Sequence, residues 1–180
     1  MAYVTPGHVA SGQTTGVSTA LQTYETDLTF LLNPPRVQCT NSTGIVLPTS
    51  GTYTLLTWDT ETFDTDGMHS TSSNTSRLTA TTAGYYKVTF IVAFPSNTTG
   101  QRTLQLRKNA AGSAGSGTMI LPYIMGTGTA SSWTFQWNGT VPLAAGDYLE
   151  GFALQSSGAT MTLPAGSYSM FEAVWCGQYP

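Results

Sequence analysis

The sequence TAGYYKV at residues 82–88 joins a glycine-marked turn to a strand of aromatic and β-branched side chains. Two other stretches have a similar form: FDTDGMH at residues 63–69 and AGDYLE at residues 145–150. Short strands bounded by glycine and aspartate turns are typical of β-sandwiches. The three stretches therefore predict a surface protein that binds or decorates, rather than an enzyme.

Ten short strands are predicted, at residues 37–40, 44–48, 52–58, 77–79, 85–94, 102–108, 119–124, 133–141, 148–155 and 168–175. Turn signals separate them, and no helical pattern interrupts them, so the fold class is an all-β sandwich or barrel. One domain, residues 37–180, accounts for them, because 180 residues leave no room for a second full domain. The glycine- and serine-rich segment 109–117 predicts a mobile surface loop.

The first 36 residues are predicted to be an N-terminal arm followed by a helix. Residues 1–17 are small, polar and rich in glycine, which favours an extended arm. After Ser18, a suitable N-cap, apolar residues recur at the spacings of a coiled-coil seam, at Leu21, Tyr24, Leu28 and Leu31. The prolines of NPP at 33–35 end this helix. Its many threonines make it marginal alone, so we expect it to pack either on its own sandwich or on further copies of the chain.

Charged residues make up only 8% of the chain, and the net charge is −3. The six lysines and arginines are scattered, which argues against nucleic acid, because phosphate binding depends on grouped basic side chains. No apolar run approaches the roughly 18 residues of a membrane span, and the first residues lack the pattern of a signal peptide. We therefore expect a soluble protein that carries no export signal of its own and does not insert into membranes.

The strands carry many aromatic residues, more than a small core needs. We expect those inside strands in the core or around a trimer axis, and those on loops to be free to stack on sugar rings. They are Tyr53, Trp58, Phe63, Tyr85, Tyr86, Phe90, Phe94, Tyr123, Trp133, Phe135 and Trp137.

The two cysteines, Cys39 and Cys176, are too few and too far apart for a zinc cluster. They are either two separate buried thiols or a disulfide, and the disulfide requires the first and last strands to be neighbours.

Four carboxylates fall within eight residues and could supply oxygen ligands for calcium: Asp59, Glu61, Asp64 and Asp66. Their spacing is not that of an EF-hand, and a solvated acidic turn explains them equally well, so we expect no cofactor and leave calcium open. His69 beside Ser70 supplies residue types of a catalytic triad, but no G-x-S-x-G turn occurs in the sequence, and we expect no catalysis.

Several of these segments resemble the globular head of complement component 1q and its tumour necrosis factor relatives. The resemblance spans residues 37 to 176 and is carried by Phe63 with Gly67, by AGYY at 83–86, LRKN at 106–109 and VPLAAGDYL at 141–149, and by the apolar final strand 168–174. It implies a ten-stranded jelly roll that assembles as a tight homotrimer.

The N-terminal region is similar to the openings of structural proteins of tailed phages, notably minor tail and fibre proteins. The matching segments are VTPG at 4–7, SGQ at 11–13 and LLNPP at 31–35, and DTDGMH at 64–69 also resembles phage versions of the head. The resemblance implies a virion protein assembled in the host cytoplasm, a trimeric knob at the tail or tail fibre. The arm and helix would dock it to other virion proteins, and the knob would bind host-surface glycans or proteins. The alternative is a capsid decoration protein with no host ligand.

Overall fold

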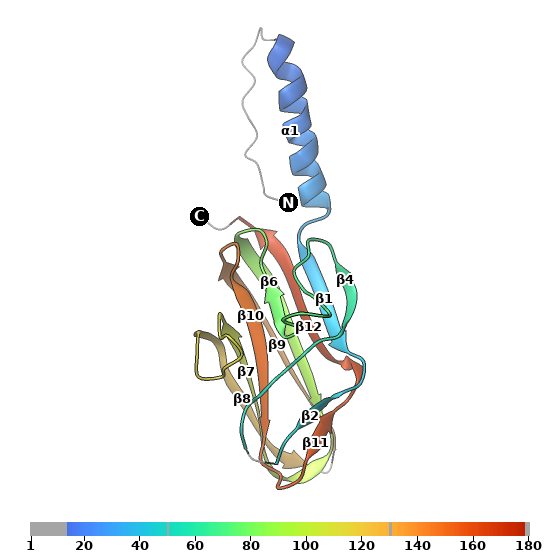
Figure 1. The fold of residues 1–180 in the computed structure, drawn as a ribbon, viewed down its shortest axis with the longest axis vertical. Helices are drawn as coiled ribbons and strands as arrows, with labels where there is room; N and C mark the ends of the chain where they lie inside the picture. Colours follow the sequence, from blue (N-terminus) through green and yellow to red (C-terminus); the bar gives the residue numbers. More distant parts are fainter. Residues whose placement is uncertain (1–13, 50, 130, 179–180) are drawn as a thin grey trace.

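In a computed structural model of the chain, residues 14–49, 51–129 and 131–178 are described. One helix, α1 (Thr14–Leu32), stands at one end of a β-sandwich (Figure 1). The described strands are β1 (Arg36–Asn41), β2 (Ile45–Leu47), β3 (Thr54–Leu55), β4 (Thr60–Asp64), β5 (Arg77–Thr79), β6 (Gly84–Phe94), β7 (Asn97–Lys108), β8 (Thr118–Thr129), β9 (Trp133–Leu143), β10 (Tyr148–Gln155), β11 (Met161–Leu163) and β12 (Gly166–Gly177). Within the described ranges, no helix has the length and apolarity needed to cross a lipid bilayer.

Two antiparallel sheets form the sandwich. The first has the order β4-β1-β12-β6-β9, and the second has the order β3-β10-β7-β8 with β5 also paired to β10. Strands β2 and β11 form a small separate sheet, near the end of the sandwich away from the helix (Figure 1). The first strand of the sandwich pairs with the last, with Val37 opposite Ala173. The all-β sandwich predicted from the sequence is confirmed, with the first and last strands as neighbours.

Alternation along the strands places one set of side chains in a single core. In β6, Tyr86, Val88 and Phe90 are buried, whereas the side chains between them face outward. The ring of Phe171 lies 5.2 Å from that of Phe90 and 5.9 Å from that of Trp58, measured between centroids. Five of the aromatic residues singled out above are buried here: Trp58, Tyr86, Phe90, Phe94 and Phe135. The sandwich core therefore takes up these five, whereas Tyr53, Phe63, Tyr85, Trp133 and Trp137 are not fully buried.

The structure has two described strands that the sequence did not predict, β4 and β11, so the expected number of ten is too low. Strand β4 has the sequence TETFD and pairs with β1, with Asp64 opposite Val37 and Thr60 opposite Thr40. It lies at the edge of its sheet and lacks alternating apolar residues, so the periodicity that marks a half-buried strand is missing.

The N-terminal region also differs from the prediction. Helix α1 begins at Thr14, so Ser18 lies inside the helix rather than at its N-cap. Residues 14–17 of the predicted arm are therefore helical, and residues 1–13 lie outside the described part of the chain.

The segment 109–117 is tied to the second sheet rather than free. Its Gly112 amide donates a hydrogen bond to Glu150 Oε2 at 2.9 Å, and its Ala111 amide donates to the Tyr148 hydroxyl at 3.1 Å. From β7, Arg107 Nη1 donates to the Ser116 carbonyl at 2.8 Å. Composition alone suggested a mobile loop, because it does not reveal these partners on neighbouring strands.

Candidate functional site

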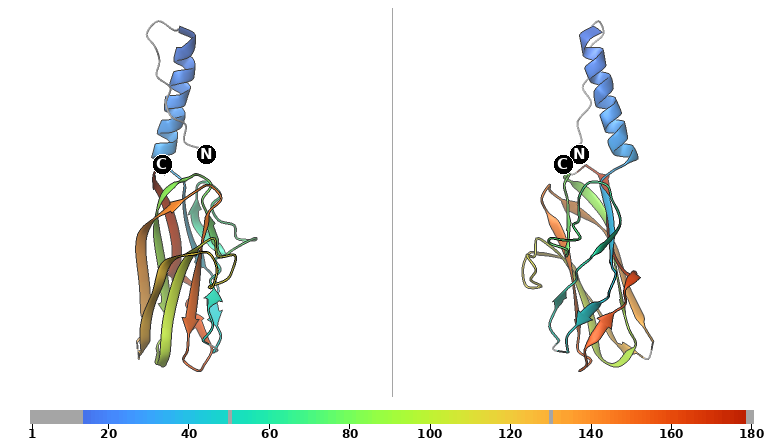
Figure 2. Two further views of the ribbon diagram at one scale, coloured as in Figure 1. Left: turned by 90° about the vertical axis from the view of Figure 1, so that its left-hand side faces the viewer. Right: turned by 45° about the vertical axis from the view of Figure 1, so that its right-hand side comes forward.

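Helix α1 exposes a stripe of apolar side chains. The four residues of the predicted seam are between 48 and 57% exposed, and the adjacent Leu32 is 76% exposed: Leu21, Tyr24, Leu28, Leu31 and Leu32. With 3.6 residues per turn, these five side chains lie within about 100° of the helix circumference. Figures 1 and 2 show that the helix projects away from the sandwich and meets it only at its C-terminal end. The seam is therefore not packed on the chain's own sheets.

A second face of the helix anchors its base to the head. Phe30 is 3% exposed and packs edge-on against Trp175, with ring centroids 4.8 Å apart and planes at 81°. It lies about 160° around the helix from Leu28. Trp175 donates from Nε1 to the Ala83 carbonyl at 3.2 Å, and from its amide to the Pro35 carbonyl at 2.8 Å. The helix is thus fixed at its base while its seam faces outward.

Gly84 explains part of the AGYY motif at this junction. A Cβ atom on Gly84 would overlap the indole ring of Trp175. A side chain there would displace the ring that holds Phe30. Sequence reasoning missed the contact between Phe30 and Trp175, because Phe30 lies outside the seam spacing and its partner is 145 residues away in the sequence.

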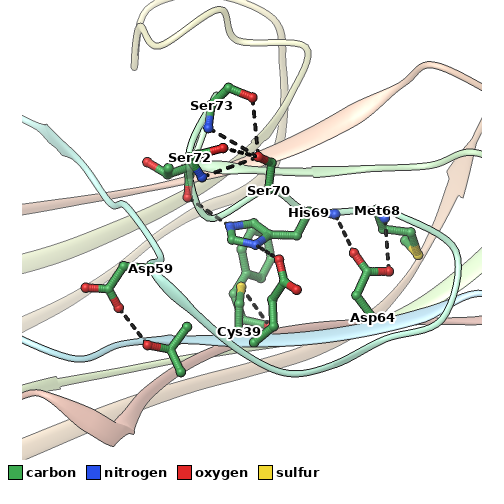
Figure 3. Close-up of polar contacts among 12 residues, drawn as sticks. Cys39, Asp59, Asp64, Met68, His69, Ser70, Ser72 and Ser73 are labelled. Atoms are coloured by element: carbon green, nitrogen blue, oxygen red, sulfur yellow. Dashed lines mark hydrogen bonds and ion pairs between the residues drawn. The ribbon is translucent and has the colours of Figure 1, made fainter.

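Asp64 organises the turn that follows β4 (Figure 3). Its Oδ1 accepts hydrogen bonds from the amides of Asp66 at 3.1 Å and Met68 at 3.0 Å, and its Oδ2 accepts from the amide of His69 at 2.8 Å. Gly67 has a φ of 64°, a conformation that glycine adopts at little cost. Three amides therefore engage the Asp64 carboxylate, and the DTDG motif is a structural turn.

Glu61 and Asp66 are also engaged by neighbours. Glu61 Oε1 lies 2.8 Å from His69 Nδ1, and Asp66 Oδ2 accepts a hydrogen bond from the Thr81 hydroxyl. The other ring nitrogen of His69, Nε2, lies 3.2 Å from the Thr75 carbonyl.

Asp59 faces a different partner, Ser42. It accepts hydrogen bonds from the Ser42 amide at 2.7 Å, the Ser42 hydroxyl at 2.9 Å and the Thr60 hydroxyl at 2.9 Å. Burial pushes the pKa of Asp59 upward, but these hydrogen bonds outweigh it and hold the pKa below its usual value.

The four acidic residues therefore do not converge on one point. Among the described residues, no group of three or more histidine, cysteine, aspartate or glutamate side chains is placed to hold a metal ion. The described geometry does not assemble the calcium site that the sequence left open.

The residue types of a catalytic triad are present but not arranged as one. The hydroxyl of Ser70 lies 3.4 Å from that of Ser72 and 3.3 Å from that of Ser73, within its own loop (Figure 3). The ring nitrogens of His69 face Glu61 and Thr75 instead. His69 and Ser70 therefore do not form a base and nucleophile pair.

The two cysteines are free thiols. Cys39 is buried opposite Phe171, whereas Cys176 is exposed five residues further along β12. Five residues of a strand span about 17 Å, far beyond the Cα separation of a disulfide. Burial, with added repulsion from Glu61 and Asp64, raises the pKa of the Cys39 thiol well above its usual range. The disulfide alternative is therefore wrong, even though the first and last strands are neighbours.

The fold is similar to those of three solved structures. The globular domain of zebrafish complement 1qA protein gives a TM-score of 0.58 at 14% identity, covering 81% of this chain and 99% of that one. Murine APRIL gives 0.59 at 10% identity, covering 79% and 98%. The Eiger TNF of S. frugiperda gives 0.57 at 12% identity, covering 81% and 94%. These likenesses establish a jelly roll of the complement 1q and tumour necrosis factor type, and at such identities they establish the fold alone.

No protein-family model matches the sequence, and a search of curated proteins finds no relative.

Proposed function

We propose that this chain is a structural virion protein of a tailed phage, a homotrimeric knob on the tail or tail fibre that attaches to the host surface. The helices of three copies would pack along the seam formed by Leu21, Tyr24, Leu28 and Leu31. The N-terminal arm would dock the knob to other virion proteins. The jelly-roll heads would face outward, toward a glycan or protein of the host.

The exposed seam is the observation that carries this proposal. A seam residue that is about half exposed gains roughly 1 kcal/mol when a partner helix covers it, so four contribute about 4 kcal/mol per chain. Association itself costs about 4–15 kcal/mol. Burial of the seam offsets only the lower end of this cost, so contacts between the heads would have to contribute the rest of the association free energy.

The end of the head opposite the helix, here called the distal end, supports a role in attachment. It includes residues 48–49 and 51–52 after β2, residues 95–101 at the turn into β7 and its first residues, and residues 156–160 between β10 and β11 (Figure 1). None of these residues is charged or aromatic. Their side chains offer hydroxyl and amide groups, which suit hydrogen bonding to a neutral, hydroxyl-rich ligand such as a glycan. Three heads on one stalk would raise the avidity of such weak contacts.

Hydrogen bonds hold the described parts of the distal end together. Gln155 Nε2 donates to the Pro48 carbonyl at 2.6 Å, and Ser156 donates from its amide to the Gln101 carbonyl at 3.1 Å. Arg102, which is 2% exposed, donates to the carbonyls of Thr99 and Gln101, each at 3.0 Å. A surface held in this way is ordered before it meets a ligand, which lowers the entropy cost of binding.

Two measurements test the proposal. Light scattering of the purified chain should give three times 19.1 kDa, and a monomer at micromolar concentration would refute the trimer. Copy number in purified virions, measured on a quantified gel, separates the two structural roles. A few to a few tens of copies supports a tail position, whereas hundreds would support capsid decoration and contradict the attachment role.

A further inference from the structure

Two contacts fix the guanidinium group of Arg77. Its Nε donates to Glu150 Oε1 at 3.0 Å, and its Cζ lies 4.1 Å from the centroid of the Tyr148 ring. Glu150 is 1% exposed and is itself held, because it accepts hydrogen bonds from the Ser76 hydroxyl at 3.1 Å and the Gly112 amide at 2.9 Å. A ligand of Arg77 would therefore not have to order its side chain, which lowers the entropy cost of binding.

The outer end of this guanidinium group is unused. A guanidinium has five N–H donors, and Nη1 and Nη2 carry four of them. Within residues 14–49, 51–129 and 131–178, Arg77 donates a hydrogen bond from Nε but from neither Nη atom. Its side chain is 27% exposed. Oxygen Oε2 of Glu150 is engaged by the Gly112 amide, so the carboxylate meets Arg77 through one oxygen alone. Both Nη atoms are thus available to a group from outside the chain.

The site lies on the outer face of the second sheet. Gly151 follows Glu150 in β10, and a Cβ atom on Gly151 would overlap the Phe90 ring in the core. Successive residues of a strand face opposite sides, so Glu150 faces outward. Five residues of β10, about 17 Å, separate Glu150 from Gln155 at the distal end. The surroundings of Arg77 are therefore a separate surface from the distal end.

The charge near Arg77 favours an anion. In the sheet, Glu150 lies opposite Arg77 on one side and Arg107 on the other, so three neighbouring positions carry two positive charges and one negative charge. Arg107 is 8% exposed and donates to uncharged oxygens. The ion pair of Lys108 with Asp147, at 3.1 Å, adds no net charge. One positive charge therefore remains without a carboxylate partner.

We propose that Arg77 is the centre of a ligand site on the outer face of the second sheet, and that it binds the anionic group of an acidic sugar. The anionic group is a carboxylate or a phosphate. One N–H from each Nη atom of a guanidinium points in the same direction, and this pair matches two oxygens of such a group. The site does not depend on the role proposed for the distal end.

The surroundings of Arg77 favour a sugar over an acidic peptide. Two segments meet at Glu150: residues 70–76, through the Ser76 hydroxyl, and residues 110–117, through the Gly112 amide. Their exposed side chains are small, hydroxyl-bearing or amide-bearing, and none is large and apolar. Protein partners bind mainly through aromatic and apolar anchors, which these segments lack. The exposed Asn74, whose carbonyl accepts the Arg77 amide at 2.9 Å, offers an amide side chain to sugar hydroxyls.

An NMR titration of the natural chain tests the site directly. The probes are glucuronate, glucose 6-phosphate and glucose, all at one ionic strength, because salt screens exposed charges. At least one of the two anionic sugars should produce saturable shifts in the backbone amide signals of Asn74, Arg77 and Gly112, and glucose should not. Saturation by one anionic sugar alone assigns the group as carboxylate or phosphate, and saturation by both shows that the site takes either. Equal shifts with glucose, or no saturable shift at these residues with either anion, would overturn the proposal.

Substitutions distinguish a ligand site from a purely structural ion pair. Arg77→Gln should weaken binding of the saturating probe by at least about tenfold, because hydrogen bonds between charged groups are lost. Arg77→Lys keeps the charge but lacks the paired N–H groups, so it should restore only part of the affinity. Lys87→Gln removes the same charge from an exposed position on the first sheet and should bind like the natural chain. Unchanged affinity in R77Q, or an equal loss in K87Q, would overturn the proposal, and the titration of the natural chain decides the question if R77Q does not fold.

Discussion

Replacing Leu28 with aspartate tests whether the helix seam joins copies of the chain. Leu28 is 57% exposed in the isolated chain, so the substitution should change the stability of the head by less than about 0.5 kcal/mol. In a trimer the same position is covered. Losing its remaining burial costs roughly 1 kcal/mol per chain, or about 3 kcal/mol per trimer, and this weakens association about 100-fold.

The carboxylates add to this loss, because three of them would face one another in an apolar seam without partners. Sedimentation velocity at several concentrations measures the effect as a shift from trimer to monomer. Thr26→Asp is the matched control, because Thr26 is exposed on the opposite side of the helix and the change adds the same charge. The role of the seam would be refuted if L28D chains stayed trimeric at the same concentrations as the natural chain. Equal dissociation of the T26D variant would show that any added charge on the helix weakens association.

Three further outcomes follow from the structure. Phe30→Ala should lower the free energy of unfolding, measured by chemical denaturation, by about 3 kcal/mol, because it loses the buried contact with Trp175. Tyr168→Ala, at a 67% exposed position, should change it by less than about 0.5 kcal/mol. Equal losses in the two variants would contradict the anchoring role of Phe30. An alkylating reagent should label Cys176 but not Cys39 in the folded protein, because burial keeps the Cys39 thiol protonated, and mass spectrometry should find one adduct before unfolding and two after it. Burial pushes the pKa of Asp147 upward, but hydrogen bonds from Asn109, Ala144 and Lys108 outweigh it and hold the pKa below its usual value. The contribution of Asp147 to folding stability is therefore present above about pH 4 and is lost as the pH falls. Asp147→Asn should make the loss of stability at acid pH less steep, and an unchanged acid dependence would count against these bonds.

Strands and helices that carry a hydrophobic pattern within their own segment were predicted from the sequence. Strand β10 occupies residues 148–155 as expected, and the four seam residues lie together on an exposed helix face. Strand β4 escaped prediction because its acidic sequence resembles a turn until its pairing with β1 is known. The jelly-roll type was suggested by resemblance of motifs, and the similarity to solved structures supports it.

The details of the candidate sites depended on contacts between distant segments. The contact of Phe30 with Trp175 and the hydrogen bonds from segment 109–117 to Glu150 each join parts of the chain that no local pattern relates. The acidic cluster was visible as composition, but the partner of each carboxylate was not. The sequence showed His69 beside Ser70, but it did not reveal that the histidine ring contacts Glu61 and Thr75 in space.

The hydrogen bonds that unite the distal end bear on how this protein can be diversified. Gln155 binds the Pro48 carbonyl of another connection, and Arg102 binds the Thr99 and Gln101 carbonyls of its own strand. Both side chains therefore hold the path of the backbone and leave the neighbouring side chains free of that task. Exposed positions such as Thr98 and Thr160 can then change identity without altering that path. A library for new binding specificities should randomise these outward positions and retain Gln155 and Arg102. The same separation of framework from contact residues would let natural variants exchange ligands while keeping one fold.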